Sequence, residues 1–154
     1  MTAADSYIHL ARPAGPGRAL FFLFHGTGGD ENQFASLAPD LIPGAGLVAP
    51  RGDVMEGRAA RFFRRTGEGV YDMTDLDRAT RKMAAFIAAQ REEQAPSETI
   101  GLGYSNGANI LASVLFVSPH LFDAAVLMHP LIPFHPVIDP AMAGRRVLIT
   151  AGRR

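Results

Sequence analysis

Cysteine is absent from this sequence of 154 residues. Its absence excludes a disulfide framework, a thiolate metal site and a cysteine nucleophile. An excess of charge of either sign is missing too, because 15 basic residues balance 15 acidic ones. A chain without net charge lacks the broad basic surface that a general nucleic-acid or anionic-membrane partner requires. Apolar runs such as Ala19–Phe24 are far too short to span a bilayer. We therefore expect no nucleic-acid partner and no membrane span.

What remains is the composition of an ordinary globular protein, with 47% hydrophobic and 19% charged residues. The length is close to the common domain size, so we expect a single domain over residues 1–154. The segment Met1–Arg12 has no basic patch followed by an apolar run, so a secretory signal is not expected. The expected location is the cytoplasm.

Short apolar runs alternate with helical periods, which predicts a mostly parallel α/β sheet with helices on both faces. Ala19–Phe24 is continuously apolar, as in a strand buried on both sides. A helix is predicted to begin at Thr74 and end before Pro96, on an apolar stripe formed by Leu76, Ala79, Met83, Phe86, Ile87 and Gln90. Another helix is predicted from Asp30, its N-cap, with Gln33 at the capping-box position. The other expected bounds are strands at Tyr7–Leu10, Gly46–Ala49, Thr99–Gly103, Ala124–Met128 and Arg145–Thr150, helices at Asp30–Leu41 and Asn106–Val117, and a long loop at Arg51–Asp72.

The run Gly103-Tyr104-Ser105-Asn106-Gly107 matches the G-x-S-x-G pattern between an expected strand and an expected helix. A tight turn there projects the serine hydroxyl above the sheet, and the glycines avoid collisions with neighbouring elements. The helix amino terminus behind Ser105 also favours a developing negative charge. An ordinary turn with Ser105 as a helix cap is the alternative. The strand-to-helix context favours a nucleophile.

A second glycine-rich loop, His25–Gly29, follows the buried strand. Acyl transfer needs backbone N–H donors where an oxyanion forms, and the amides of Thr27 and Asn106 are the candidates. Gly26 and Gly28 would let the loop approach a substrate closely. A phosphate loop is less suitable, because no lysine follows the glycines and two acidic residues would repel the phosphate. A simple strand-to-helix turn is the remaining alternative.

Three motifs occur here in the order in which they occur in the phospholipase/carboxylesterase family of α/β-hydrolases, which includes acyl-protein thioesterase-like enzymes. They are the loop His25–Gly29, the turn Ala49–Gly52 and the elbow Gly103–Gly107. The stretches Arg61–Arg65 and Glu68–Asp72 resemble a bacterial carboxylesterase branch of that family. The resemblance covers nearly the whole chain, from about Phe21 to the end.

This resemblance implies an α/β-hydrolase fold and a serine hydrolase that acts on small-molecule esters or thioesters without a cofactor. It further implies that Ser105 is the nucleophile and that the Thr27 and Asn106 amides form the oxyanion hole. In the family the acid of the triad comes just after the strand that here reads Val147–Gly152. The histidine follows one more helix and strand, and this sequence ends at Arg154 before either.

We therefore expect an incomplete fold, without the carboxyl-terminal strand and helices, and a chain with little or no activity. Its last strand would be an unpaired apolar edge, which favours a homodimer. A dyad of Ser105 with His129 or His135 is one alternative, although a place at the pocket border explains these histidines more simply. Another alternative is a non-catalytic remnant that binds a small ligand or a partner chain.

Phe63, His129 and Pro130 are the candidates for the wall of a substrate pocket. Phe63 stands in a segment that contains Arg58, Arg61, Arg64 and Arg65, and the flanking acidic residues make a nucleic-acid strip a weak interpretation. We favour a salt-bridged loop, and the alternative is that one of these arginines and one phenylalanine form the substrate wall. No two histidines have metal-ligand spacing on one helix, so no metal is expected.

Overall fold

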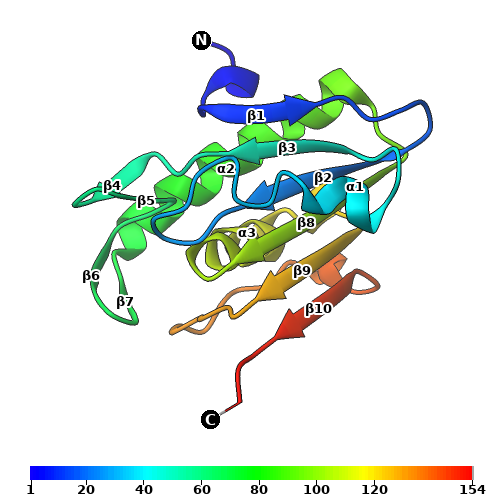
Figure 1. The fold of residues 1–154 in the computed structure, drawn as a ribbon. Coiled ribbons are helices and arrows are strands. Elements are labelled where there is room, and N and C mark those ends of the chain that lie inside the picture. The colour runs from blue at the N-terminus through cyan, green and yellow to red at the C-terminus, as the bar shows by residue number, and fades with distance from the viewer. Residues whose placement is uncertain (154) are drawn as a thin grey trace.

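The computed structural model describes residues 1–153, and Arg154, the last residue of the expected domain, lies outside the described residues. At its centre is a six-stranded sheet in the order β1-β3-β2-β8-β9-β10 (Figure 1). β1 runs antiparallel to β3, and the other neighbouring pairs are parallel. The mostly parallel sheet expected from the sequence is confirmed. The bounds of its strands are β1 His9–Arg12, β2 Ala19–Phe24, β3 Gly46–Pro50, β8 Glu98–Tyr104, β9 Ala124–Met128 and β10 Arg146–Thr150.

Helices cover both faces of this sheet. α2 (Met73–Gln94) and α3 (Asn106–Val117) pack on one face, and the short α1 (Leu37–Leu41) packs on the other (Figure 1). Side chains of β2 alternate between the two apolar layers, which explains why this strand is apolar throughout. Residues 1–153 also contain three short 3-10 helices: η1 Ala3–Asp5, η2 Pro119–Leu121 and η3 Pro140–Met142.

α2 has the buried stripe that its sequence predicts. The Asp72 side chain caps the helix by accepting a 3.0 Å hydrogen bond from the Asp75 N–H. The helix ends where Ala95 turns into the left-handed region at φ 43°, just before Pro96. All six residues predicted for the stripe are buried. Within residues 1–153 no helix is both long and apolar enough to cross a membrane.

The helix predicted for Asp30–Leu41 is much shorter than expected, because only Leu37–Leu41 is α-helical. Pro39 explains the difference, since its ring would collide with the carbonyl four residues earlier, at Ala35. A proline is tolerated only in the first turn, so the helix begins just before it. The prediction of a helix from Asp30 was therefore wrong.

The prediction of a loop over Arg51–Asp72 was also wrong, because this segment forms two hairpins. They are β4 (Val54–Glu56) with β5 (Ala59–Arg61), and β6 (Arg65–Gly67) with β7 (Val70–Tyr71). Glycines in the left-handed region lie in both turns, Gly57 at φ 61° and Gly69 at φ 69°. Such turns match the twist of paired strands, which makes these glycines a hairpin signal.

The first strand is displaced from its expected position. We predicted Tyr7–Leu10, whereas β1 is His9–Arg12 at the antiparallel edge of the sheet. Tyr7 is instead buried, with its ring edge-on to Phe86 of α2 at 5.3 Å between centroids. Of the predicted strand, Tyr7 therefore packs against α2, whereas Leu10 pairs with Ala49 in the sheet.

Candidate active site

Ser105 lies in a strained turn between β8 and α3. Its φ of 52° and ψ of −114° fall in a region that non-glycine residues rarely occupy. The backbone is fixed there by two hydrogen bonds, from the Ser105 N–H to Met128 O at 2.9 Å and from the Asn109 N–H to Ser105 O at 3.0 Å. The hydroxyl makes no capping bond to α3. The serine side chain is therefore not used as a helix cap.

The two glycines of the elbow are required by close packing. A Cβ on Gly107 would collide with the carbonyls of Phe24 and His25, and one on Gly103 would overlap the backbone of Gly107. α3 therefore starts in direct contact with the end of β2. This contact brings the Ser105 turn next to the loop that follows β2.

Thr27 and Asn106 lie at the ends of neighbouring strands. β2 and β8 pair in register up to Phe24 and Gly103, so the two following loops leave the sheet side by side. Asn106 is the first residue of α3, where a backbone N–H has no partner inside the helix. Among residues 1–153 no hydrogen bond occupies the N–H of Thr27 or of Asn106. Both amides are thus available as donors.

The loop of Thr27 is held by neighbouring groups. The Gly26 N–H donates to Gln33 Oε1 at 3.1 Å, so Gln33 serves the loop instead of a helix cap. A Cβ on Gly26 would approach the Tyr104 ring to 2.7 Å, and Gly28 adopts a φ of 84°. The close approach and the turn explain why glycine occupies these two positions.

His25 braces this loop from inside the molecule. Its Nδ1 donates to Gly26 O at 2.7 Å, and its Nε2 accepts from the Gly52 N–H at 2.9 Å. The ring is almost completely buried and lies 4.6 Å from that of Phe62 between centroids. Burial lowers the pKa of His25, which keeps the ring neutral. Arg51, beside Gly52, forms a two-bond ion pair with Glu31, with N–O distances of 2.6 and 2.7 Å.

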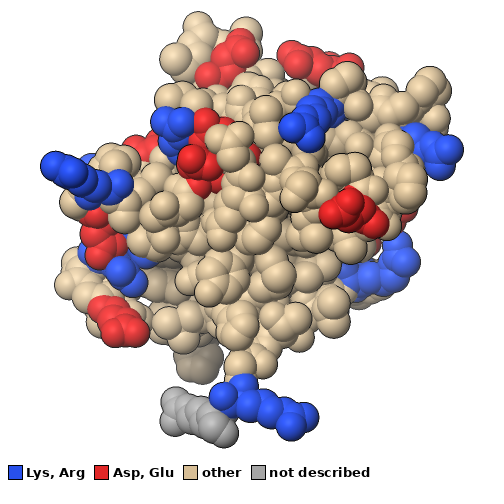
Figure 2. All heavy atoms as spheres, viewed as in Figure 1, with Lys and Arg blue, Asp and Glu red and all other residues tan. Residues whose placement is uncertain are grey.

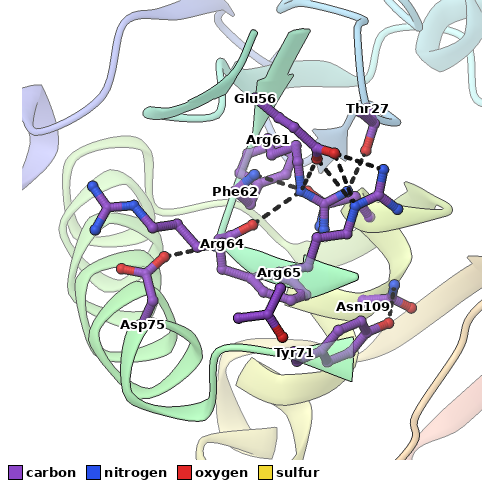
Figure 3. A network of polar contacts seen from close by, with 12 residues as sticks. Thr27, Glu56, Arg61, Phe62, Arg64, Arg65, Tyr71, Asp75 and Asn109 are labelled. Atoms are coloured by element: carbon purple, nitrogen blue, oxygen red, sulfur yellow. Dashed lines mark hydrogen bonds and ion pairs between the residues drawn. The ribbon is translucent and has the colours of Figure 1, made fainter. Parts of the chain in front are cut away.

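β5 and the following residue, Phe62, contact both donor segments. Figure 3 shows Arg61 close to Thr27. Ala60 O accepts from the Gly28 N–H at 3.1 Å. Arg61 Nη1 donates to Thr27 Oγ1 at 2.7 Å, and the Phe62 N–H donates to Asn106 Oδ1 at 2.7 Å. The hairpin segment is therefore part of the site.

A pocket of about 140 Å³ opens beside Ser105. Its lining includes Arg61, Tyr71, Ser105, Asn106, Asn109 and His129. A cavity of this size is smaller than the usual ligand pocket of roughly 300–1,000 Å³ and suits a small group. Phe63 and Pro130 do not line it. Phe63 is completely buried, with its ring edge-on to Tyr71 at 4.8 Å, and Pro130 is half-buried after His129.

Asn109, Tyr71 and Leu131 close a ring of hydrogen bonds at the pocket wall. Asn109 Nδ2 donates to the Tyr71 hydroxyl at 2.7 Å, this hydroxyl donates to Leu131 O at 2.6 Å, and the Leu131 N–H donates to Asn109 Oδ1 at 2.7 Å. The sequence patterns did not identify Tyr71 or Asn109 as site residues, and Arg61 was only one of four arginines among which a substrate-wall residue was the less favoured alternative. One signal was available, because Asn109 is a polar residue three positions after Asn106 in a mainly apolar helix.

The histidines considered as partners of Ser105 differ in their positions. His129 lines the pocket, with an exposed side chain and a φ of 53°. His135 is exposed and does not line this pocket. Within residues 1–153 no histidine is hydrogen-bonded to a carboxylate. Asp123 and Asp139 instead accept from the backbone N–H groups of Thr99 and Ala141.

Charges of both signs are scattered over the face in Figure 2, while its lower part, over β9 and β10, is mostly uncharged. Across the described residues no group of three His, Cys, Asp or Glu side chains is placed to hold a metal ion.

Known proteins resemble this chain in both sequence and structure, although no family model matches it. The chain is 43% identical to MhqD of Bacillus subtilis (strain 168), whose name describes a hydrolase, over 87% of this chain and 68% of that protein. It is 63% identical to an Agrobacterium tumefaciens protein of unknown function, with a TM-score of 0.94 over 100% of this chain and 76% of the other. It is also 34% identical to the Bacillus cereus carboxylesterase, with a TM-score of 0.87 over 94% and 70% of the two chains.

Proposed function

Because the chain belongs to the carboxylesterase-like family of α/β-hydrolases, we propose that it is a serine hydrolase of carboxylic esters or thioesters. The observation that carries the proposal is the strained Ser105 turn, whose hydroxyl is not used as a cap and whose neighbouring amides are unoccupied. A strained serine between a strand and a helix is typical of a nucleophile in this fold.

The chemistry follows from the positions of these groups. Ser105 Oγ attacks the acyl carbon and loses its proton to a base, while the carbonyl oxygen becomes an oxyanion. The N–H groups of Thr27 and Asn106 donate to this oxyanion. The tetrahedral intermediate then collapses, the alcohol or thiol leaves with a proton, and an acyl group remains on Ser105. Water hydrolyses this ester and restores the serine.

We also propose that the 154-residue chain turns over esters slowly. Among the described residues His129 is the one histidine at the pocket, and no carboxylate is bonded to it. A serine hydroxyl is a poor nucleophile without an oriented base. An oxyanion hole and binding alone still give roughly 10³–10⁴-fold acceleration over water. Slow turnover of a short p-nitrophenyl ester is therefore expected, at a rate that His129→Gln does not change.

Covalent labelling by a fluorophosphonate tests the nucleophile directly. We expect the chain to be labelled at one site, Ser105→Ala to abolish the labelling, and Ser36→Ala, on the exposed surface, to keep it. Peptide mass spectrometry identifies the modified residue. Labelling that persists in Ser105→Ala would show that another residue is the nucleophile.

A second candidate function is non-catalytic binding of a small ligand or a partner chain. The absence of a histidine–carboxylate pair in residues 1–153 favours it. The two candidates differ in one result, because a binding protein would show neither fluorophosphonate labelling nor ester turnover above that of Ser105→Ala.

A further inference from the structure

The two proposed oxyanion donors lie far apart in the sequence, yet both are tied to the same short segment. Three hydrogen bonds make these connections. They join Ala60 to Gly28, Arg61 to Thr27 and Phe62 to Asn106. We propose that Arg61 is a positioning residue that fixes the Thr27 amide relative to the Asn106 amide. This inference rests on the proposed function, because it concerns the oxyanion hole of the same site.

Arg61 is built into the protein as a rigid connection. Its guanidinium donates from Nη1 to Thr27 Oγ1 at 2.7 Å and from Nε to Phe63 O at 3.1 Å. The side chain is only 3% exposed, and Glu56 lies 3.4 Å away as a counter-ion. A planar guanidinium loses little freedom for each bond it makes, so it holds two groups at a fixed separation. Thr27 is thereby held against β5 by its side chain, while its backbone N–H stays free.

Burial of this arginine has a cost that a surface position would avoid. Burial lowers the pKa of Arg61, and the nearby Arg65 acts in the same direction. The Glu56 carboxylate is shared, since Arg65 donates to both of its oxygens at 3.0–3.2 Å. A buried charge is weak evidence for stability, and in some proteins its fixed geometry gives conformational specificity instead. For Arg61 that specificity is the position of Thr27.

Phe62, the residue after Arg61, holds the side chain of Asn106. The Asn106 side chain is 2% exposed, and its Oδ1 accepts from the Phe62 N–H at 2.7 Å. The Nδ2 group has no partner among the described residues, so the bond to Phe62 alone orients the amide. If the Asn106 amide were flipped, its Nδ2 group would face the Phe62 N–H, and two donors would meet. β5 and the residue that follows it, Phe62, therefore fix the first residue of α3 as well as the loop after β2.

Kinetics of fluorophosphonate labelling test the proposal on the chain as it exists. In this reaction Ser105 Oγ bonds to phosphorus, fluoride leaves, the hydroxyl proton passes to solvent, and the phosphoryl oxygen occupies the oxyanion position. The saturating rate kinact reports on the oxyanion hole, and the half-saturating concentration KI reports on binding of the reagent. Both are measured for Arg61→Met, Arg61→Lys, Thr27→Val and the double variant Arg61→Met with Thr27→Val.

We expect kinact to fall by about 10- to 100-fold in Arg61→Met, by more than any change in KI, because a misplaced donor weakens the transition state more than binding of the reagent. Thr27→Val keeps the backbone N–H and should lose a similar factor. The double variant should be no slower than either single one, since all three lack the same hydrogen bond. Arg61→Lys should stay slow, because one ammonium cannot hold Thr27 and Phe63 O together. Arg58→Met, an exposed arginine in the turn before β5, is the control and should match the unmodified chain.

The outcomes separate this inference from the function on which it rests. If the unmodified chain is not labelled at Ser105, both fail. If Ser105 is labelled but Arg61→Met and Thr27→Val keep the original kinact, the positioning role is wrong and the nucleophile stands. A purely structural role would lower the thermal midpoint and leave kinact of the folded fraction unchanged. Should Arg61→Met fail to fold, Thr27→Val still tests the bond with the arginine in place.

Discussion

His25 is a buried histidine whose two ring nitrogens are both used. The Nδ1–H donates to Gly26 O, and the unprotonated Nε2 accepts from the Gly52 N–H. A proton on Nε2 would face the proton of Gly52 and break the second bond. Since burial also opposes a charge, the folded protein binds this proton less readily than the unfolded chain does.

Stability should therefore fall as the pH is lowered below the ordinary histidine pKa of 6.5. In that range the unfolded chain binds a proton and the folded protein does not, so each pH unit costs at most about 1.4 kcal/mol until the lowered folded pKa is reached. Urea unfolding at pH 7.5 and pH 5.0 measures the difference. His25→Gln should be less stable at pH 7.5 and should depend less on pH, whereas exposed His135→Gln should behave like the unmodified chain. Equal pH dependence in the two variants would contradict this assignment.

Some residues of the candidate site could be predicted from the sequence and others could not. The G-x-S-x-G pattern pointed to Ser105 and Asn106 because a strand-to-helix turn is a local feature. The contact of Arg61 with Thr27 and the place of Tyr71 in the site were not foreseen, because the partners Thr27 and Leu131 lie in other segments. Side-chain bonds between distant segments leave no periodic signal in a single sequence.

At the scale of elements, helices and strands with a strong burial pattern were predictable. Ala19–Phe24, Asn106–Val117 and Ala124–Met128 have the expected bounds, because burial on one or both sides imposes an apolar run or stripe. The two hairpins within residues 51–72 were not predicted, since strands of two or three residues are too short to show alternation. The turn glycines Gly57 and Gly69 were the available sequence signal for these hairpins.

Strand β10 is the edge of the sheet opposite β1, and within residues 1–153 nothing pairs with its outer side. Thr150 O accepts from the His129 N–H at 3.0 Å, so the polar groups of every second residue point toward β9. By alternation, the N–H and C=O groups of Val147 and Ile149 point outward. Leu148 and Ile149 are each 60% exposed. Such an edge is a template for another strand.

We predict that β10 pairs antiparallel with β10 of a second copy. The register that pairs all five residues places Leu148 opposite itself and joins Val147 to Ile149 by hydrogen bonds, while Arg146 meets Thr150 rather than another arginine. Leu148→Lys would place two like charges opposite each other and should yield monomers. Val137→Lys, at an 89% exposed site outside the sheet, should remain dimeric. Light scattering after size-exclusion chromatography decides, and a monomeric unmodified chain would refute the pairing.

For the molecule as a whole, the candidate site and the free edge lie in different parts of one sheet. The donor loops follow β2 and β8, which are the two middle strands, whereas β10 is the last strand on one side (Figure 1). The central position of β2 was predictable, because a strand that is apolar throughout belongs in the middle of a parallel sheet. The registry of Phe24 with Gly103 could not be predicted, since it depends on the contact between Gly107 and the end of β2.

The central position of β2 and β8 affects the order in which parts of the protein unfold. Amide protons of central strands exchange with solvent only through large unfolding events, while those at an edge exchange by local fraying. In the monomeric variant Leu148→Lys, whose β10 edge is not covered by a second copy, we expect the amide protons of β2 and β8 to exchange most slowly and the outward ones of Val147 and Ile149 to exchange rapidly. Mild urea should therefore release β10 first, with fluorophosphonate labelling of Ser105 unchanged until the central strands exchange. Loss of labelling together with fraying of β10 would contradict this order. If the order holds, Ser105, the proposed nucleophile, belongs to the last part of the protein to unfold.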